Sequence, residues 1–145
     1  MPRIDYTTQA EALFGRFAER HGLAYETITG APIEVCWAFP EQSKLSLPLT
    51  LGLQNGDELN FGVADFWSYF FPFEDVVEEF ERAIDAWVVG EARIAVTRFR
   101  GRLLQVRKGT QWKTVYCANG CLFPFRLTPF RFVMNGEGEH STCEA

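Results

Sequence analysis

An unusually aromatic segment, residues 66–73, is the part of this sequence best suited to bind another molecule. Its aromatic residues are Phe66, Trp67, Tyr69, Phe70, Phe71 and Phe73. Each such side chain can bury on the order of 150 to 250 Å². A solvated loop would not carry so much apolar surface, so the segment must fill the core, line a pocket, or form a patch that a partner covers. Filling the core is the ordinary outcome for such residues, and a pocket or a patch makes the segment our candidate binding region.

An acidic residue directly precedes the aromatic segment. Apolar residues alternate at Leu59, Phe61 and Val63, and continuing this alternation would place Asp65 on the buried face of a strand. A carboxyl group in an apolar pocket has a raised pKa and can act as a general acid or base. The competing interpretation, which we favour, is that Asp65 begins a turn and binds backbone amides. A small hydrolase or isomerase working through Asp65 or a thiol remains the alternative function.

The cysteines raise the question of a metal site. Cys117 and Cys121 flank a predicted turn, and His140 and Cys143 follow near the end of the chain, which gives four soft ligands for a tetrahedral zinc ion. Zinc knuckles usually place about two residues between paired cysteines, whereas three separate these two. We therefore predict no metal and no cofactor. Cys36 lies on a predicted strand and shows no pattern typical of a nucleophile.

Basic residues gather in one region. Arg98, Arg100 and Arg102 surround a glycine, and Arg93, Arg107, Lys108 and Lys113 lie on neighbouring predicted strands. Such a row could bind phosphates or another anion, and Trp112 and Tyr116 could stack bases. A nucleic-acid-binding domain is usually basic as a whole, whereas this chain has a net charge of −5 and a pI of about 5.1. We expect these strands to pair, within the molecule or across a dimer, with the acidic residues of the second helix, Glu78, Glu79, Glu81 and Asp85.

Length and composition indicate one globular domain over residues 1–145. The chain has 145 residues, of which 47% are hydrophobic and 23% charged, which is far from the composition of disordered chains. Its first residues lack the apolar run of a signal peptide, and no apolar stretch approaches the length of a membrane span. We therefore expect a cytoplasmic protein with no membrane partner, whose four cysteines are reduced thiols.

Two helices are predicted from apolar residues that recur every three to four positions. Thr8 and Glu11 resemble a capping box, which predicts a helix over 8–21 that ends at Gly22. The second helix follows Pro72 and spans about 73–89.

Strands are predicted where the apolar period changes to two. Before the second helix these are runs around 33–39 and 45–53, and a third that follows an Asn55-Gly56 turn. Pro48 lacks a backbone donor, so its strand should lie at a sheet edge or carry a bulge. After the second helix we expect strands at about 91–100, 102–108, 111–117 and 121–127, with turns at Gly101, Gly109 and Asn119-Gly120.

This order predicts an α+β fold with two layers. We expect one mainly antiparallel meander sheet of 6–8 strands with both helices packed on it, in the order α-β(3-4)-α-β(3-4), followed by a flexible tail over about 134–145. We find no convincing residue repeat that would indicate a duplication. The function that we expect is a non-enzymatic binding module, with a homodimer as one arrangement. Its partner would be another protein or an apolar small ligand, bound through residues 66–73.

Overall fold

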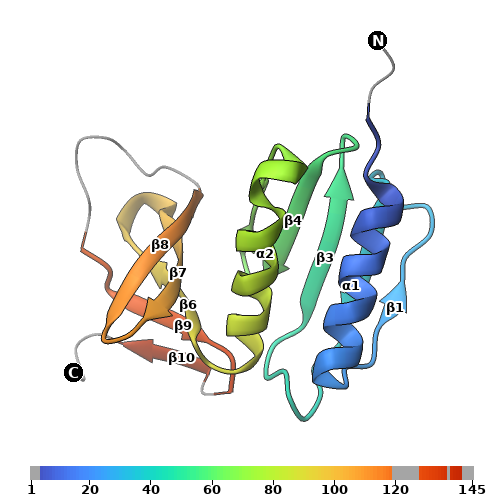
Figure 1. Ribbon diagram of the computed structural model, residues 1–145. Helices are drawn as coiled ribbons and strands as arrows, with labels where there is room; N and C mark the ends of the chain where they lie inside the picture. The colour runs from blue at the N-terminus through green and yellow to red at the C-terminus, as the bar shows by residue number, and fades with distance from the viewer. Residues whose placement is uncertain (1–3, 119–127, 137, 142–145) are drawn as a thin grey trace.

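The computed structural model describes residues 4–118, 128–136 and 138–141, and it shows an α+β protein with two helices and two antiparallel sheets (Figure 1). Helix α1, Thr7–His21, buries five apolar residues, Ala10, Leu13, Phe14, Phe17 and Ala18. It begins one residue before the predicted start, because the Asp5 carboxylate accepts a hydrogen bond from the backbone N–H of Thr7. The predicted capping box is therefore wrong. Gly22 ends α1 in the left-handed conformation, as expected, with φ 63°.

The first sheet contains β1 (Glu26–Thr27), β2 (Val35–Phe39), β3 (Leu49–Gln54), β4 (Glu58–Val63) and β5 (Phe66–Trp67), in that spatial order. The predicted turn at Asn55 and Gly56 is confirmed, since both residues have positive φ between paired strands β3 and β4. The expectation for Pro48 is wrong. Strand β3 begins directly after this proline and lies in the middle of the sheet, because the missing donor falls outside the ladder.

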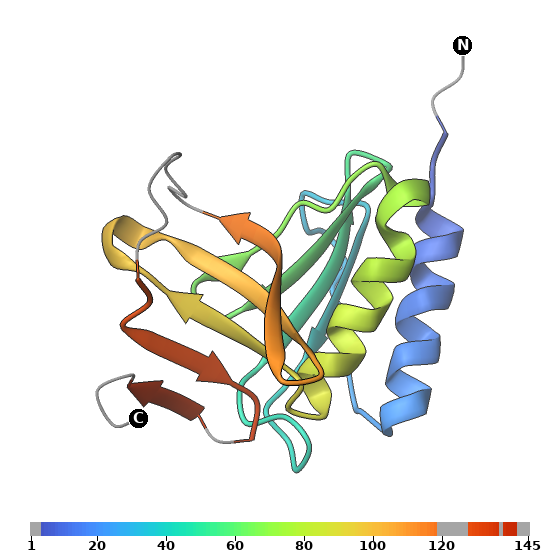
Figure 2. The same ribbon diagram turned by 60° about the vertical axis from the view of Figure 1, so that its left-hand side comes forward.

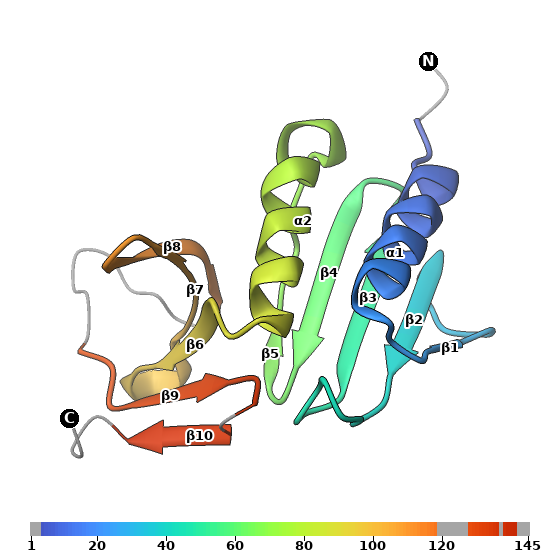
Figure 3. The same ribbon diagram turned by 60° about the horizontal axis from the view of Figure 1, so that its bottom comes forward.

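Helix α2, Phe73–Val88, contacts both sheets. Its fully buried residues include Phe80, Ile84 and Trp87, and the Trp87 ring packs against Phe61 of β4 with ring centroids 5.6 Å apart. The same helix also contacts the first two strands that follow it, β6 (Ala92–Val96) and β7 (Arg102–Lys108). Figures 1 and 3 show α2 standing between the two sheets, and Figure 2 shows it side by side with α1.

The second sheet has the order β10-β9-β6-β7-β8, where β8 is Gln111–Ala118, β9 is Arg131–Met134 and β10 is Gly138–Ser141. The predicted strand 91–100 is too long. The observed strand β6 ends at Val96, and a short 3-10 helix, Arg98–Arg100, follows. The predicted strand 121–127 and the Asn119-Gly120 turn lie outside the described residues.

The described residues within the predicted tail, 134–136 and 138–141, are structured, as two observations show. Residues 138–141 pair with β9 as a strand, and Asn135 is buried. The Asn135 amide group donates hydrogen bonds to the carbonyls of Lys44 (2.8 Å) and Val88 (2.9 Å) and accepts one from the Ser46 N–H (2.8 Å). Asn135 thus ties the second sheet to the loop before β3 and to the end of α2.

The prediction of a single meander sheet is also wrong. Strand β6 pairs with β7 and β9 and with no strand of the first sheet, so the described strands form two separate sheets. Residues from both helices and both sheets nevertheless form one hydrophobic cluster. Helix α2 connects the two sheets, because the broad apolar stripe along one side of the helix contacts β4 of the first sheet and β6 and β7 of the second.

Candidate functional site

The aromatic segment 66–73 divides between the core and the surface. Residues 66–70 run antiparallel to β4, where Phe66 lies opposite Val63, Trp67 opposite Gly62, and Phe70 opposite Leu59. Side chains alternate along this extended segment. Phe66, Ser68 and Phe70 are buried, and so is Phe73 at the start of α2, which stacks on Tyr6. Trp67 is half-buried, whereas Tyr69 and Phe71 are 43% and 59% exposed.

The exposed aromatic residues border the face of the first sheet that is turned away from the helices, which we call the outer face. The opposite face packs on the helices, as the contacts of Trp37 with Phe14 and of Phe61 with Trp87 show. The strand register places two rows of residues across the outer face: Glu26, Ala38, Thr50, Gly62 and Trp67 in one, and Cys36, Gly52 and Asn60 in the next. The centre of this face is therefore made of small residues, with aromatic side chains along the β5 side.

Two glycines allow larger side chains to lie flat on the outer face. A Cβ atom at Gly62 would come within 2.5 Å of the Trp67 ring, and one at Gly52 would come within 2.8 Å of Ile33. A side chain at position 62 would therefore have to displace the Trp67 ring, whereas at position 52 the nearest atom is the movable end of the Ile33 side chain. Asn60 lies beside them and is completely buried, and its Oδ1 atom has no hydrogen-bond partner among the described residues, while its Nδ2 donates to the Ser68 carbonyl. Cys36, on the same face, is a free thiol whose pKa is raised by burial, which disfavours the nucleophilic thiolate.

Asp65 does not lie in a pocket. It occupies the turn between β4 and β5 with its side chain 62% exposed, as the turn interpretation predicts. Its carboxylate accepts two hydrogen bonds from Arg102, at 3.1 Å from Nε and 2.6 Å from Nη2. The Arg102 guanidinium lowers the pKa of Asp65, which is the opposite of the shift that a buried general acid needs.

We expect the Asp65 carboxyl to titrate below the ordinary aspartate range of about 3.9, and Arg102→Gln to raise its midpoint towards that value. Because the folded-state pKa is lowered, the stabilisation from this pair is present above the unfolded-state pKa and is lost as pH falls through the folded-state pKa. Carboxyl ¹³C NMR across an acid titration measures the midpoint. Arg107→Gln, at the far end of β7, is the control and should leave it unchanged. An unchanged midpoint in Arg102→Gln would contradict the assignment.

The basic residues do not form the predicted row. Arg98 and Arg100 are exposed on the 3-10 helix, while the Arg102 side chain turns to Asp65. The Arg93 guanidinium lies over the rings of Trp112 (4.2 Å) and Phe132 (3.9 Å), so the predicted base-stacking tryptophan already has a partner. Burial lowers the pKa of Arg93. Tyr116, the other predicted stacking residue, packs against Phe66 and Phe70, and its hydroxyl accepts a hydrogen bond from the Tyr69 N–H.

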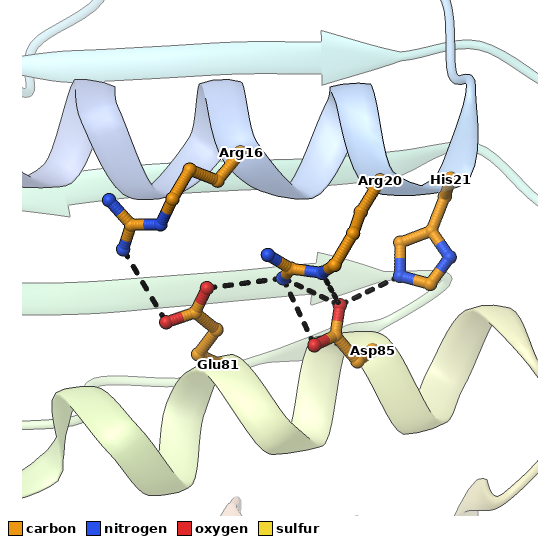
Figure 4. A network of polar contacts seen from close by, with 5 residues as sticks. All are labelled: Arg16, Arg20, His21, Glu81 and Asp85. Atoms are coloured by element: carbon orange, nitrogen blue, oxygen red, sulfur yellow. Dashed lines mark hydrogen bonds and ion pairs between the residues drawn. The ribbon is translucent and has the colours of Figure 1, made fainter.

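The acidic face of α2 pairs with α1 and not with the basic strands, which corrects the sequence expectation. Arg16 and Arg20 are one helical turn apart, as are Glu81 and Asp85, so their side chains meet where the helices run side by side (Figure 4). Arg20 Nη2 lies 3.1 Å from Glu81 Oε2 and 2.8 Å from Asp85 Oδ1, and Asp85 raises the pKa of Arg20. The His21 ring lies 2.7 Å from Asp85 through Nε2.

The proposed zinc ligands do not form a site in the described part of the chain. Cys117 is disulfide-bonded, so it is neither the reduced thiol that we expected nor a thiolate ligand. Cys121 and Cys143 lie outside the described residues, and for His140 only the backbone, on β10, is described. Among the described residues no group of three His, Cys, Asp or Glu is placed to hold a metal ion.

A groove that sequence reasoning missed lies between α2 and the β7–β8 hairpin. Its volume is about 570 Å³, and His21 and Asp85 lie at its border with α1. Three of its cations, Arg107, Lys108 and Lys113, belong to the basic strands that the sequence singled out, and a fourth, Arg82, comes from the acidic helix. The sequence held one signal for this groove. Arg82 is the single basic residue in the otherwise acidic α2.

Comparisons with known proteins identify no relative: no family model matches the chain, and no curated protein or solved structure is significantly similar to it. In the part of the chain that the structure describes, neither helix combines the length and the apolar character that crossing a membrane requires.

Proposed function

We propose that this chain is a non-enzymatic binding protein and that the outer face of its first sheet binds a segment of another protein. One observation carries the proposal. Trp67, Tyr69 and Phe71 alternate onto the same side of the chain, and Tyr69 and Phe71 are among the most exposed large apolar residues described. Clusters of exposed aromatic residues are typical of protein interfaces, where they supply much of the binding energy.

An open face favours a protein segment over a small ligand. An apolar small molecule is usually held in a concave site that covers most of its surface. The outer face instead presents the half-buried Ala38 and Thr50 beside the Trp67 ring, which lies over Gly62. A peptide segment can lie along such a face and place its own apolar side chains against the rings.

Charge indicates the chemistry of the partner. The charged residues that the register places on the outer face are Glu26, opposite Ala38, and Glu58, opposite Gln54. Neither forms an ion pair with a described residue. A second copy of the chain would bring like charges together, whereas an apolar segment flanked by lysine or arginine would complement them. We therefore propose a partner segment of that kind.

Selection from a phage-displayed random peptide library tests the proposal. We expect the wild-type chain to enrich peptides with an apolar centre and basic flanks. The double variant Tyr69→Ser/Phe71→Ser should bind these peptides at least about tenfold more weakly, since each buried aromatic contact is worth 1 kcal/mol or more. Val89→Ser is the matched control, because it removes an exposed apolar residue that follows α2, away from the outer face, and should bind as the wild type does.

Two results would overturn the proposal. One is equal binding of the selected peptides by the wild type and a double variant whose circular dichroism and melting temperature are unchanged. The other is a concentration-dependent dimer in sedimentation equilibrium that the double variant abolishes, because a second copy would then cover the outer face.

A further inference from the structure

The groove between α2 and the β7–β8 hairpin, called the α2 groove below, has an apolar floor. Ala83 and Ala86 come from α2, Val89 follows the helix directly, and Val106 comes from β7. Val89 is 63% exposed, the largest exposure among the large apolar residues described. A volume of about 570 Å³ falls within the range of sites that hold small molecules. The floor is therefore suited to the apolar body of a ligand of that size.

Two of the carboxylates at the α2 groove are neutralised by neighbours. Asp85 accepts hydrogen bonds from Arg20 and lies 2.7 Å from the His21 ring (Figure 4). Glu91 pairs with Arg107 at 3.8 Å. Only Glu79 remains among the acids that line the groove without an ion pair to a described residue. Repulsion of a bound anion is correspondingly small.

Three cations at the α2 groove have no such partner. Arg82 of α2 and Lys108 and Lys113 of the hairpin are exposed, and none forms an ion pair within the part of the chain that the structure describes. They approach the groove from both of its walls. An excess of positive charge in this position, on a chain with a net charge of −5, creates a local field that attracts anions.

We propose that the α2 groove binds a small amphiphilic anion, with its apolar body on the floor and its carboxylate, sulfonate or phosphate group between Arg82 and Lys113. This site is separate from the outer face, which lies across the first sheet from the helices. It neither needs nor supports the protein-binding function proposed above.

Two related fluorescent probes test the charge requirement. 8-Anilinonaphthalene-1-sulfonate carries an anionic group, and N-phenyl-1-naphthylamine is its uncharged counterpart. We expect Arg82→Gln/Lys113→Gln to weaken binding of the sulfonate about tenfold, the effect of losing a charged hydrogen bond, and to leave binding of the amine unchanged. Added salt should lower the affinity for the sulfonate and leave the affinity for the amine unchanged. The matched control is Arg98→Gln/Arg100→Gln, which removes two exposed arginines on the 3-10 helix and should change neither affinity.

Further arms locate the site and identify the head group. Sulfonate binding should shift the amide signals of Ala83, Ala86 and Val106 in ¹H–¹⁵N spectra and should persist in Tyr69→Ser/Phe71→Ser, which separates this site from the outer face. Laurate, dodecyl phosphate and inorganic phosphate, used as competitors, distinguish a carboxylate from a phosphate ligand and show whether the apolar body is required. Equal sulfonate affinity in the groove variant and the control would overturn the proposal. So would a result in which inorganic phosphate displaces the sulfonate as well as dodecyl phosphate does, because the apolar body would then not be required.

Discussion

Replacing Trp87 by alanine is expected to lower the free energy of unfolding by about 3–5 kcal/mol, which is the cost of truncating a fully buried aromatic side chain. A domain of this size is usually stable by about 5–15 kcal/mol, so the substitution should remove a large fraction of the total stability. The indole Nε1 of Trp87 has no hydrogen-bond partner among the described residues, so the lost stability comes from packing. Urea denaturation followed by fluorescence and circular dichroism measures the change.

The same variant tests whether the two sheets share one interior. Trp37 lies in the first sheet and Trp112 in the second, and their indole N–H signals report on each. Because α2 packs on both sheets, both signals should disappear in a single transition, at a lower urea concentration than in the wild type. Val89→Ala, an exposed position at the end of the same helix, should shift the midpoint little. A transition that moves for Trp37 and not for Trp112 would contradict the shared interior.

Replacing Asn135 by alanine is expected to cost about 3 kcal/mol. The change leaves the Ser46 N–H and the carbonyls of Lys44 and Val88 without their partner, and unsatisfied buried groups cost about 1–3 kcal/mol each, less where water enters. Hydrogen exchange at the Ser46 amide should accelerate as well.

Ser46→Ala is the comparison for this prediction. It removes the hydroxyl that accepts a hydrogen bond from the Gly136 N–H and donates a long one, 3.4 Å, to Asn135 Oδ1. The three shorter hydrogen bonds of Asn135, to the Ser46 N–H and to the carbonyls of Lys44 and Val88, stay in place. Its effect on thermal stability should therefore be clearly smaller than that of Asn135→Ala. Equal melting temperatures for the two variants would show that Asn135 does not connect the elements as described.

Local features of the fold could be predicted from the sequence because they depend on neighbouring residues. The apolar period of α1, the left-handed Gly22 and the Asn55-Gly56 turn are each specified within a few positions. The division into two sheets could not be predicted in this way. It depends on the pairing of β6 with β9, which are far apart in the sequence. The apolar patterns of several strands would suit pairing in either sheet.

The candidate sites show the same limit. Alternation within residues 66–71 already separates Phe66 and Phe70 from Trp67, Tyr69 and Phe71, so the division of the aromatic segment was open to prediction. The matching one-turn spacings of Arg16 with Arg20 and of Glu81 with Asp85 were a further signal, although only the packing of α1 beside α2 brings them together. The α2 groove needed the structure, because its walls come from segments that are distant in sequence.

The position of α2 has a consequence for how this protein can be divided. A fragment that stopped after Gly90 would keep the helix but leave uncovered the side that β6 and β7 occupy, and a fragment that started there would lose the helix on which its sheet rests. We expect neither piece to retain enough buried apolar surface to offset the entropy lost on ordering it. We therefore expect the two sheets to require each other's presence for folding, even though no hydrogen bond of a strand ladder joins them.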